Sequence, residues 1–311
     1  MKSLAVRAGL AVAFASLGLS AHAEEGVEDQ LSNSRFVVGA GLRNHPEYAG
    51  SDRHKTSLVP VLAYEYRWLR LSASGASAIL GFGQDARGPG ATAALIDRPD
   101  LKLGFGLRID SGRKASDSVE LTGFDDIKRT LRGRVYASYA LNSRWTVAGN
   151  VSQDLLGNRG GAIASTDLGY RMPLGPRTEM TVGAGASWAD VRHMSTYFGV
   201  TDAESARSGL PVYRPGAGLL DVHAGIGLTT AFTPRWIGFA GVGSSRIESD
   251  AATSPLTRKP GSVSGSIGLA YRCCSMWLLA RMRTGSDATA TPHAASVQTM
   301  TAPDGRSESV V

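Results

Sequence analysis

The sequence predicts an all-β protein that closes into an antiparallel up-and-down transmembrane barrel of about 12 strands. Three observations lead to this fold class. The chain begins with an export signal, its long segments alternate apolar and polar residues, and its connections alternate between short and long. A period of two is that of a β-strand, and one apolar face opposite a polar face is typical of strands between lipid and a polar lumen.

The N-terminus has the three parts of a secretory signal peptide. Lys2 and Arg7 are basic, residues 8–19 form a short apolar run, and Ala21-His22-Ala23 matches a cleavage site. We therefore expect residues 1–23 to be removed and residues 24–34 to form a short periplasmic segment. No later stretch holds about 18 consecutive apolar residues, the length that a transmembrane helix needs. The expected location is the outer membrane of a Gram-negative cell, with its lipid as a partner.

The alternation is clearest in residues 101–110, where odd-numbered positions are apolar and even-numbered positions are glycine or charged. Segments 131–141, 219–232 and 262–273 alternate in the same way. Such runs match the roughly 9–11 residues of a tilted membrane-spanning strand. The charged residues that this pattern turns toward the lumen are Lys102, Arg108, Asp110, Arg132, Arg134, Asp221 and His223.

These charges leave two interpretations open, a small pore with a mixed-charge lining or a closed lumen with Arg–Asp pairs. A twelve-stranded barrel lies between small filled barrels and wide porins, so its size does not decide between them.

Extending the pattern places the barrel at residues 35–273. We expect strands at 35–43, 57–67, 69–76, 89–96, 101–110, 129–141, 144–156, 160–172, 178–191, 217–232, 235–247 and 262–273.

The connections between these segments fall into two sets. The short set comprises 67–69, 97–100, 142–143, 173–176 and 233–234. The alternate set is long, except for 157–159, and comprises 44–56, 77–88, 111–128, 192–216 and 248–261. Outer-membrane barrels have short periplasmic turns and long outer loops, so both chain ends are expected on the periplasmic side.

Tryptophans mark the expected membrane boundaries. Trp68, Trp145 and Trp236 each flank a short turn, and Trp188 lies near the opposite end of its strand. Indole rings favour the level of the lipid headgroups. These four residues are the predicted aromatic girdle.

The sequence offers little for catalysis, cofactors or nucleic acid. His193 lies near Asp190 and Ser195, but a triad requires geometry and not proximity in sequence. We expect no enzyme activity, cofactor or metal site. Removing Lys2 and Arg7 with the signal lowers the formal charge from +6 to +4, and no basic stripe points to nucleic acid.

Several motifs resemble those of the MipA/OmpV family of outer-membrane proteins, named for the MltA-interacting protein. The matching stretches are Val38-Gly-Ala-Gly-Leu, Pro46-Glu-Tyr-Ala-Gly-Ser-Asp52, Gly112-Arg113-Lys, Leu121-Thr-Gly-Phe-Asp-Asp-Ile127, Tyr197-Phe-Gly-Val-Thr201, Ser208-Gly-Leu-Pro211, Gly216-Ala-Gly-Leu-Leu-Asp-Val222, Ser254-Pro-Leu256 and Gly268-Leu-Ala-Tyr-Arg272. They cover nearly the whole mature chain to Arg272.

The resemblance implies an outer-membrane barrel. It also implies a scaffold role in assembly of the peptidoglycan sacculus, with a lytic transglycosylase and a penicillin-binding protein as partners. Other family members resemble porins or adhesins, so the alternatives are a small-solute channel or adhesion through loops 111–128 and 192–216. Fold transfers between relatives more safely than function.

One feature departs from the family pattern. The family's last strand ends at an aromatic residue after Tyr-Arg, whereas here Tyr271-Arg272 is followed by Cys273-Cys274 and a polar segment. We expect residues 274–311 to be a disordered tail. A frameshift near codon 273 is one hypothesis, which the neighbouring nucleotide frames would test.

Overall fold

The computed structural model describes residues 36–66, 69–72 and 89–273 of the 311-residue chain. The expected signal peptide, the segment 24–34 and the expected tail 274–311 lie outside these residues, as does Trp68. No helix among the described residues is long and apolar enough to cross a membrane.

Twelve strands and a few short helices make up the described chain. The strands are β1 (Phe36–Pro46), β2 (His54–Tyr66), β3 (Leu69–Ser72), β4 (Gly90–Asp97), β5 (Leu101–Asp110), β6 (Thr130–Ala140), β7 (Trp145–Asp154), β8 (Ala162–Gly175), β9 (Thr178–Ala189), β10 (Gly218–Ala231), β11 (Trp236–Ile247) and β12 (Gly261–Cys273). The helices are η3 (Ala115–Asp117), η4 (Val119–Leu121), α2 (Val191–Phe198), α3 (Asp202–Ser208) and α4 (Ser249–Ala252).

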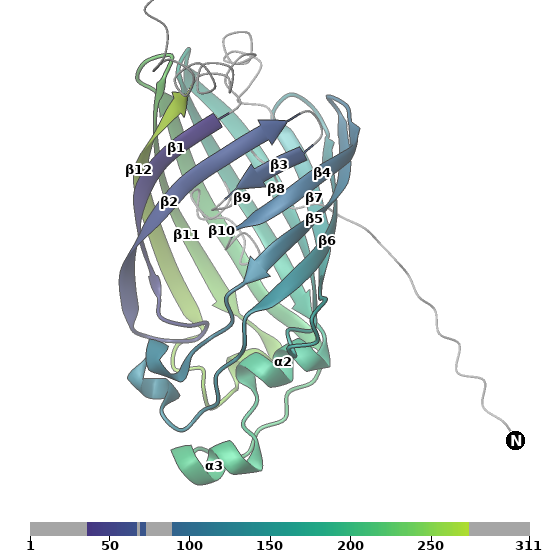
Figure 1. Ribbon diagram of the computed structural model, residues 1–311, viewed down its shortest axis with the longest axis vertical. Coiled ribbons are helices and arrows are strands. Elements are labelled where there is room, and N and C mark those ends of the chain that lie inside the picture. The colour runs from purple at the N-terminus through teal and green to yellow at the C-terminus, as the bar shows by residue number, and fades with distance from the viewer. Residues whose placement is uncertain (1–35, 67–68, 73–88, 274–311) are drawn as a thin grey trace, which may run out of the picture. The chain divides into compact units, whose positions relative to one another are not determined.

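The strands close into one antiparallel barrel, in which each strand pairs with its neighbours in sequence and β1 pairs with β12 (Figure 1). In the closing pair, Phe36 lies opposite Cys273 and Asn44 lies opposite Gly265. The predicted twelve-stranded antiparallel barrel is confirmed. Closure gives each described strand a neighbour on both sides, as strands that cross a membrane require.

The two faces of each strand differ as the alternation predicts. On β5 the side chains of Phe105, Leu107 and Ile109 are exposed, whereas Gly104 and Gly106 are buried. On β10 the exposed Val222, Ile226 and Leu228 alternate with buried positions. The outer surface is therefore apolar and the inner surface carries small and polar residues, as in barrels that face lipid.

The third strand is described over Leu69–Ser72, which pair with Ala63–Tyr66 of β2. Residues 73–76 of the expected strand lie outside the described residues. On its other side, β2 pairs with β1, where Pro60 lies opposite Ala40.

The long loops are not irregular, because several of them form helices that gather at one end of the barrel (Figure 1). The Asp190 side chain caps α2 by accepting a hydrogen bond from the His193 backbone. Thr201 and Glu204 form a capping box at the start of α3, and Gly209 ends that helix with a φ of 74°. The sequence analysis predicted none of these helices, although Thr-x-x-Glu followed by glycine is a recognisable helix signature.

Candidate functional site

The interior of the barrel near the long loops holds most of its buried polar side chains. Arg132, Asp221 and His223 have exposed fractions of 4%, 0% and 8%. Lys102, Arg108, Asp110 and Arg134 are half-buried, on the face opposite the exposed apolar residues. The seven predicted lumen residues do not form one cluster but take part in separate groups.

The first group joins β8 and β10 through His223. Its Nδ1 atom lies 2.8 Å from Oδ1 of Asp221, and its Nε2 atom lies 2.8 Å from Oδ1 of Asp167. Register places Asp167 of β8 opposite Gly185 of β9, and Gly185 opposite His223 of β10. The missing side chain at Gly185 leaves the space in which Asp167 and His223 meet.

A bulge in β10 contributes to this group. The pairing of β10 with β9 shifts between Leu219 and Asp221, so that Leu220 and Asp221 are both buried. A bulge turns an extra residue away from the regular alternation. As a result, Leu220 joins an apolar core while Asp221 remains beside His223.

The second group ties the barrel wall to a loop. The guanidinium of Arg132 donates to the carbonyl oxygens of Gly160 and Gly161, at 2.9 and 3.1 Å. It also lies 3.7 Å from the carboxylate of Asp110. The imidazole of His193, on α2, lies 2.9 Å from the same Gly160 carbonyl. Arg132 and His193 thus hold loop 155–161 between β6 and α2.

Asp154, the last residue of β7, also holds this loop through its carboxylate. Its carboxylate accepts hydrogen bonds from the backbone N–H groups of Leu156, Gly157 and Gly160, and from the hydroxyl of Thr130. A carboxylate with four donors satisfies its buried oxygens fully.

The remaining predicted residues lie in smaller contacts. Arg134 donates to Oδ1 of Asn150 at 3.1 Å. Lys102 pairs with Asp97 at 3.4 Å, near the short turns. The sequence analysis did not single out Asp167, Asn150 or Asp154, although Asp167 alternates with the exposed Leu168 and the same period-two argument would have included it.

Above this interior, the long loops pack into a cap with two apolar cores. One contains Ile163, Ala189, Met194, Phe198, Leu220, Ile247 and Ala251. The other contains Tyr48, Leu121, Phe124, Val200 and Leu256. Leu121, Met194 and Ala251 have no exposed surface. Loops from four connections, 47–53, 111–129, 190–217 and 248–260, therefore pack together through these cores.

Polar contacts reinforce the cap. The Tyr48 hydroxyl donates to Oε2 of Glu120 at 2.8 Å, and burial together with this contact raises the pKa of the Tyr48 phenol above its ordinary range. Arg113 donates to the carbonyl of Tyr197 at 2.8 Å and lies 5.9 Å from the centre of the Tyr48 ring. Burial lowers the pKa of the Arg113 guanidinium, and cation–π contact partly offsets the cost of desolvating it.

No catalytic or metal arrangement emerges in the part of the chain that the structure describes. His193 contacts Gly160 and stacks on Tyr197, and the Asp190 carboxylate caps the helix. No group of three or more His, Cys, Asp or Glu side chains is placed to hold a metal ion in these residues.

The three tryptophans of the predicted girdle that the structure describes lie on the outer surface. Trp145 and Trp236 are 39% and 46% exposed beside short turns, and Trp188 is 44% exposed near the other end of β9. Trp145 packs on Tyr170 and Trp236 packs on Tyr271, with ring centres 4.8 and 5.1 Å apart.

Comparison with known families settles the relationship of this chain. The family described as MltA-interacting protein MipA matches residues 38–273, which span the barrel from β1 to the end of β12. The protein belongs to the MltA-interacting protein family. The resemblance inferred from the motifs is confirmed, and the chain is a β-barrel of the outer-membrane type.

Two curated members of the family are distant relatives. The MltA-interacting proteins of Escherichia coli (strain K12) and Shigella flexneri are each 29% identical to this chain over 164 residues. The match covers 51% of this chain and 64% of each relative. The chain therefore matches less than two thirds of the length of these relatives.

Solved structures with similar topology include two porins. The KdgM porin is 10% identical with a TM-score of 0.39, over 76% of this chain and 98% of the porin. The NanC porin is 9% identical with a TM-score of 0.41, over 76% of this chain and 100% of the porin. This MltA-interacting family member thus has porins among its neighbours, at a similarity that carries no argument about function.

Proposed function

We propose that this protein is a non-enzymatic scaffold of the outer membrane that binds a lytic transglycosylase and a penicillin-binding protein on its periplasmic face. The name of its family and of its two relatives supports the first partner. In this proposal, residues 1–23 direct export, the apolar outer surface contacts lipid, and the seven predicted charged residues fill the lumen. The four predicted tryptophans mark the headgroup levels.

One observation carries the choice of a scaffold over a channel. At the loop end, Arg132 and His193 hold Gly160, and the described loops pack into the cap. Packed apolar cores do not open without losing buried contacts. This packing favours a role that needs no passage through the barrel.

The opposite end offers a surface of suitable charge. Each short turn among the described residues carries an exposed arginine, namely Arg98, Arg144, Arg177 and Arg235. A surface that carries charges of one sign associates faster with a surface of the opposite sign. We propose that the turns 97–100, 142–143, 173–176 and 233–234, with 67–69, form the contact face for an acidic surface on the transglycosylase.

A capture experiment tests this proposal. The purified barrel is crosslinked in membranes to the lytic transglycosylase of the same cell, and the double variant Arg98→Glu/Arg177→Glu is compared with Lys55→Glu/Lys259→Glu, whose changes lie toward the loop end. We expect the turn variant to lose capture and the loop variant to keep it. Equal capture by all three proteins, or no capture by the native chain, would contradict the proposed contact face.

The second candidate is a small-solute channel. The charged pairs Lys102–Asp97 and Arg171–Glu179 near the short turns favour it, because they keep polar groups along that half of the lumen. Planar-bilayer recording separates the two functions. The scaffold predicts no steady conductance, whereas a steady ohmic pore whose ion selectivity changes on Arg132→Ala or Arg134→Ala would support the channel. Adhesion, the third candidate, would use the outer surface of the cap.

A further inference from the structure

Two short turns of the barrel are built alike around an arginine, a tryptophan and a tyrosine. At the β6–β7 turn, Nη1 of Arg144 lies 3.4 Å from the hydroxyl of Tyr170. At the β10–β11 turn, Nη1 of Arg235 lies 3.5 Å from the hydroxyl of Tyr271. In both turns the tryptophan that follows the arginine packs on the same tyrosine.

The backbone of the two turns is held in the same way. Oδ1 of Asn142 accepts hydrogen bonds from the N–H groups of Arg144 and Trp145. At the other turn, Oγ1 of Thr233 accepts from the N–H groups of Arg235 and Trp236. Each arginine carbonyl also accepts from the residue after the tyrosine, at 2.8 Å. The guanidinium groups are therefore fixed at the rim of the apolar surface.

The chemistry of this rim suits a phosphate. A guanidinium presents several donors that match phosphate oxygens, and a phenol hydroxyl adds another. Tryptophan and tyrosine rings favour the level of lipid headgroups. Both arginines are exposed and can reach an anion at that level.

The two turns differ in what lies beyond them on the outer surface. Past the Trp236–Tyr271 pair, the next outward pairs are Gly238 with Leu269 and Ala240 with Ile267. Past the Trp145–Tyr170 pair comes Val147 with Leu168. The Phe232 ring lies over Gly238, and the small side chain of Ala240 leaves room beyond it where β7 carries Val147 next to its tryptophan.

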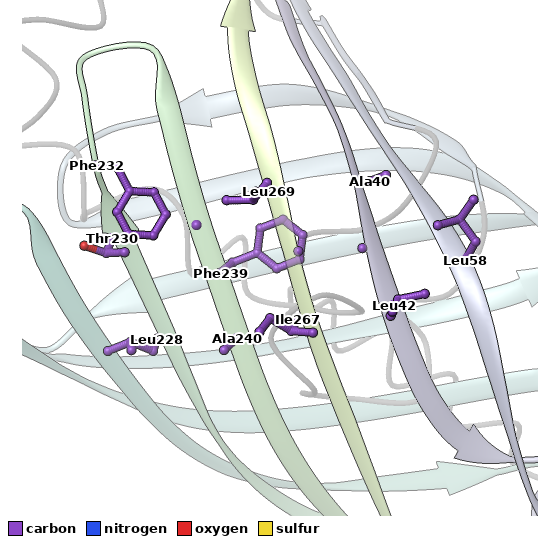
Figure 2. Close-up of a pocket in the computed structure, with 13 residues that line it drawn as sticks. Ala40, Leu42, Leu58, Leu228, Thr230, Phe232, Phe239, Ala240, Ile267 and Leu269 are labelled. Carbon is purple, nitrogen blue, oxygen red and sulfur yellow. The ribbon is translucent and has the colours of Figure 1, made fainter.

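That room is part of an apolar groove of about 540 Å³ on the outer surface (Figure 2). Its walls come from β1, β2, β10, β11 and β12 and include Ala40, Leu42, Leu58, Leu228, Phe232 and Leu269. Thr230 is the one polar side chain among its lining residues. The groove crosses several strands, and its apolar lining suits a hydrocarbon chain.

We propose that Arg235, Tyr271 and the groove form a binding site for one phospholipid in the periplasmic leaflet of the outer membrane. The lipid phosphate binds Arg235 and the Tyr271 hydroxyl, and one acyl chain lies in the groove between Phe232 and Leu42. This inference rests on the proposed placement of the short turns in the periplasm. A second copy of the barrel fits less well, because it would cover the charge of Arg235 with apolar surface and leave the guanidinium without a counter-ion.

The test uses the purified full chain in a mild detergent, with phosphatidylglycerol added at increasing concentration and bound lipid counted by native mass spectrometry. We expect the native protein to keep one lipid. Arg235→Gln removes a charge-assisted contact and should weaken binding about tenfold. Ala240→Phe fills the groove and should abolish retention. Arg144→Gln is the matched control, because it changes the same type of turn away from the groove, and it should bind as the native protein does.

Further measurements distinguish a bound phospholipid from the other candidate occupants of the groove. Diacylglycerol, which lacks the phosphate, should bind more weakly than phosphatidylglycerol, and inorganic phosphate should not displace the lipid. Equal losses in Arg235→Gln and Arg144→Gln, or retention unchanged in Ala240→Phe, would overturn the proposal. Dimers that become monomers in Ala240→Phe would assign the groove to self-association instead. The heat-dependent gel shift of folded barrels checks each variant, and partner capture remains a separate readout of the scaffold role.

Discussion

The Nδ1 atom of His223 lies 2.8 Å from Oδ1 of Asp221, a side chain with no exposed surface. The other ring nitrogen lies equally close to Asp167 on a different strand. A histidine ring has two nitrogens that can each take part in a hydrogen bond, and here each one faces a carboxylate oxygen. His223 therefore links β8 and β10 inside the barrel.

Replacing His223 should destabilise the barrel strongly. His223→Leu leaves the Asp221 and Asp167 carboxylates without their partner, and breaking a buried charged contact costs about 3–5 kcal/mol. Urea unfolding of the barrel in vesicles measures this loss. His54→Leu, at an exposed position, is the control. Adding Asp221→Leu to His223→Leu should recover part of the stability, and a His223→Leu variant as stable as the control would disprove the role of this contact.

Gly185 should not tolerate even a methyl group. A β-carbon at this position would lie 2.5 Å from Oδ1 of Asp167 and 2.6 Å from Nε2 of His223. We expect Gly185→Ala to lower the free energy of unfolding by about 1–3 kcal/mol, as overpacking does. Gly175→Ala provides the comparison, since nothing lies within 4 Å of a β-carbon there. Similar denaturation midpoints for the two variants would show that Asp167 and His223 can move apart freely.

Packing in the cap should weaken when a buried side chain of its apolar cores is truncated. Leu121 has no exposed surface. Leu121→Ala should lower the free energy of unfolding by about 2–5 kcal/mol, the range for buried leucines. Val119 lies two residues away and is 69% exposed, so Val119→Ala serves as the control. Limited proteolysis of the loops should be faster in Leu121→Ala only. Protection of both variants against the protease would mean that the cap does not depend on this core.

Helix α3 should loosen in acid. Desolvation raises the pKa of Glu204, but hydrogen bonds from the Thr201 backbone and hydroxyl and from the Asp125 N–H outweigh it, so the pKa is lowered overall. A lowered pKa means that the stabilisation is present above the ordinary glutamate pKa of about 4.3 and is lost as the pH falls through the folded value. The protection of α3 amides against hydrogen exchange, relative to an unstructured chain at the same pH, should therefore fall below about pH 4.

The Glu204→Gln variant tests the assignment of this pH dependence. Glutamine can still complete a capping box, so α3 should persist while the protection of its amides no longer changes between neutral and acid pH. Asp202→Asn, on the same helix and mostly exposed, should keep the native pH dependence. Loss of the dependence in Asp202→Asn, or its persistence in Glu204→Gln, would contradict the proposed cause.

The strands were predictable from sequence to within a few residues. Strand β5 occupies residues 101–110, as expected, and β6 lies at 130–140 within the expected 129–141. The prediction was wrong at β1, which continues to Pro46, and at the start of β2, which lies at His54. The β1–β2 hairpin continues past the apolar alternation into polar residues such as Asn44 and Thr56, which lie opposite each other. Pairing through backbone hydrogen bonds does not require apolar side chains.

The loops were the part that sequence reasoning treated least well. Connections 111–128 and 192–216 were expected to be long outer loops, and the structure shows that they contribute Leu121, Met194 and Phe198 to packed cores. Isolated apolar residues in a polar loop have no period, so their partners in other loops cannot be identified from spacing.

The sequence by itself determined the faces of the strands, their number and the side on which the turns are short, because each depends on alternation and length within one segment. The tertiary structure alone decided the register in which β1 pairs with β12, that the loops form a cap, and that Asp167 meets His223 at a distance of 56 residues along the chain. The last contact depends on the register of three strands and on a bulge at Leu220. Register is a property of paired strands, so a single strand does not contain it.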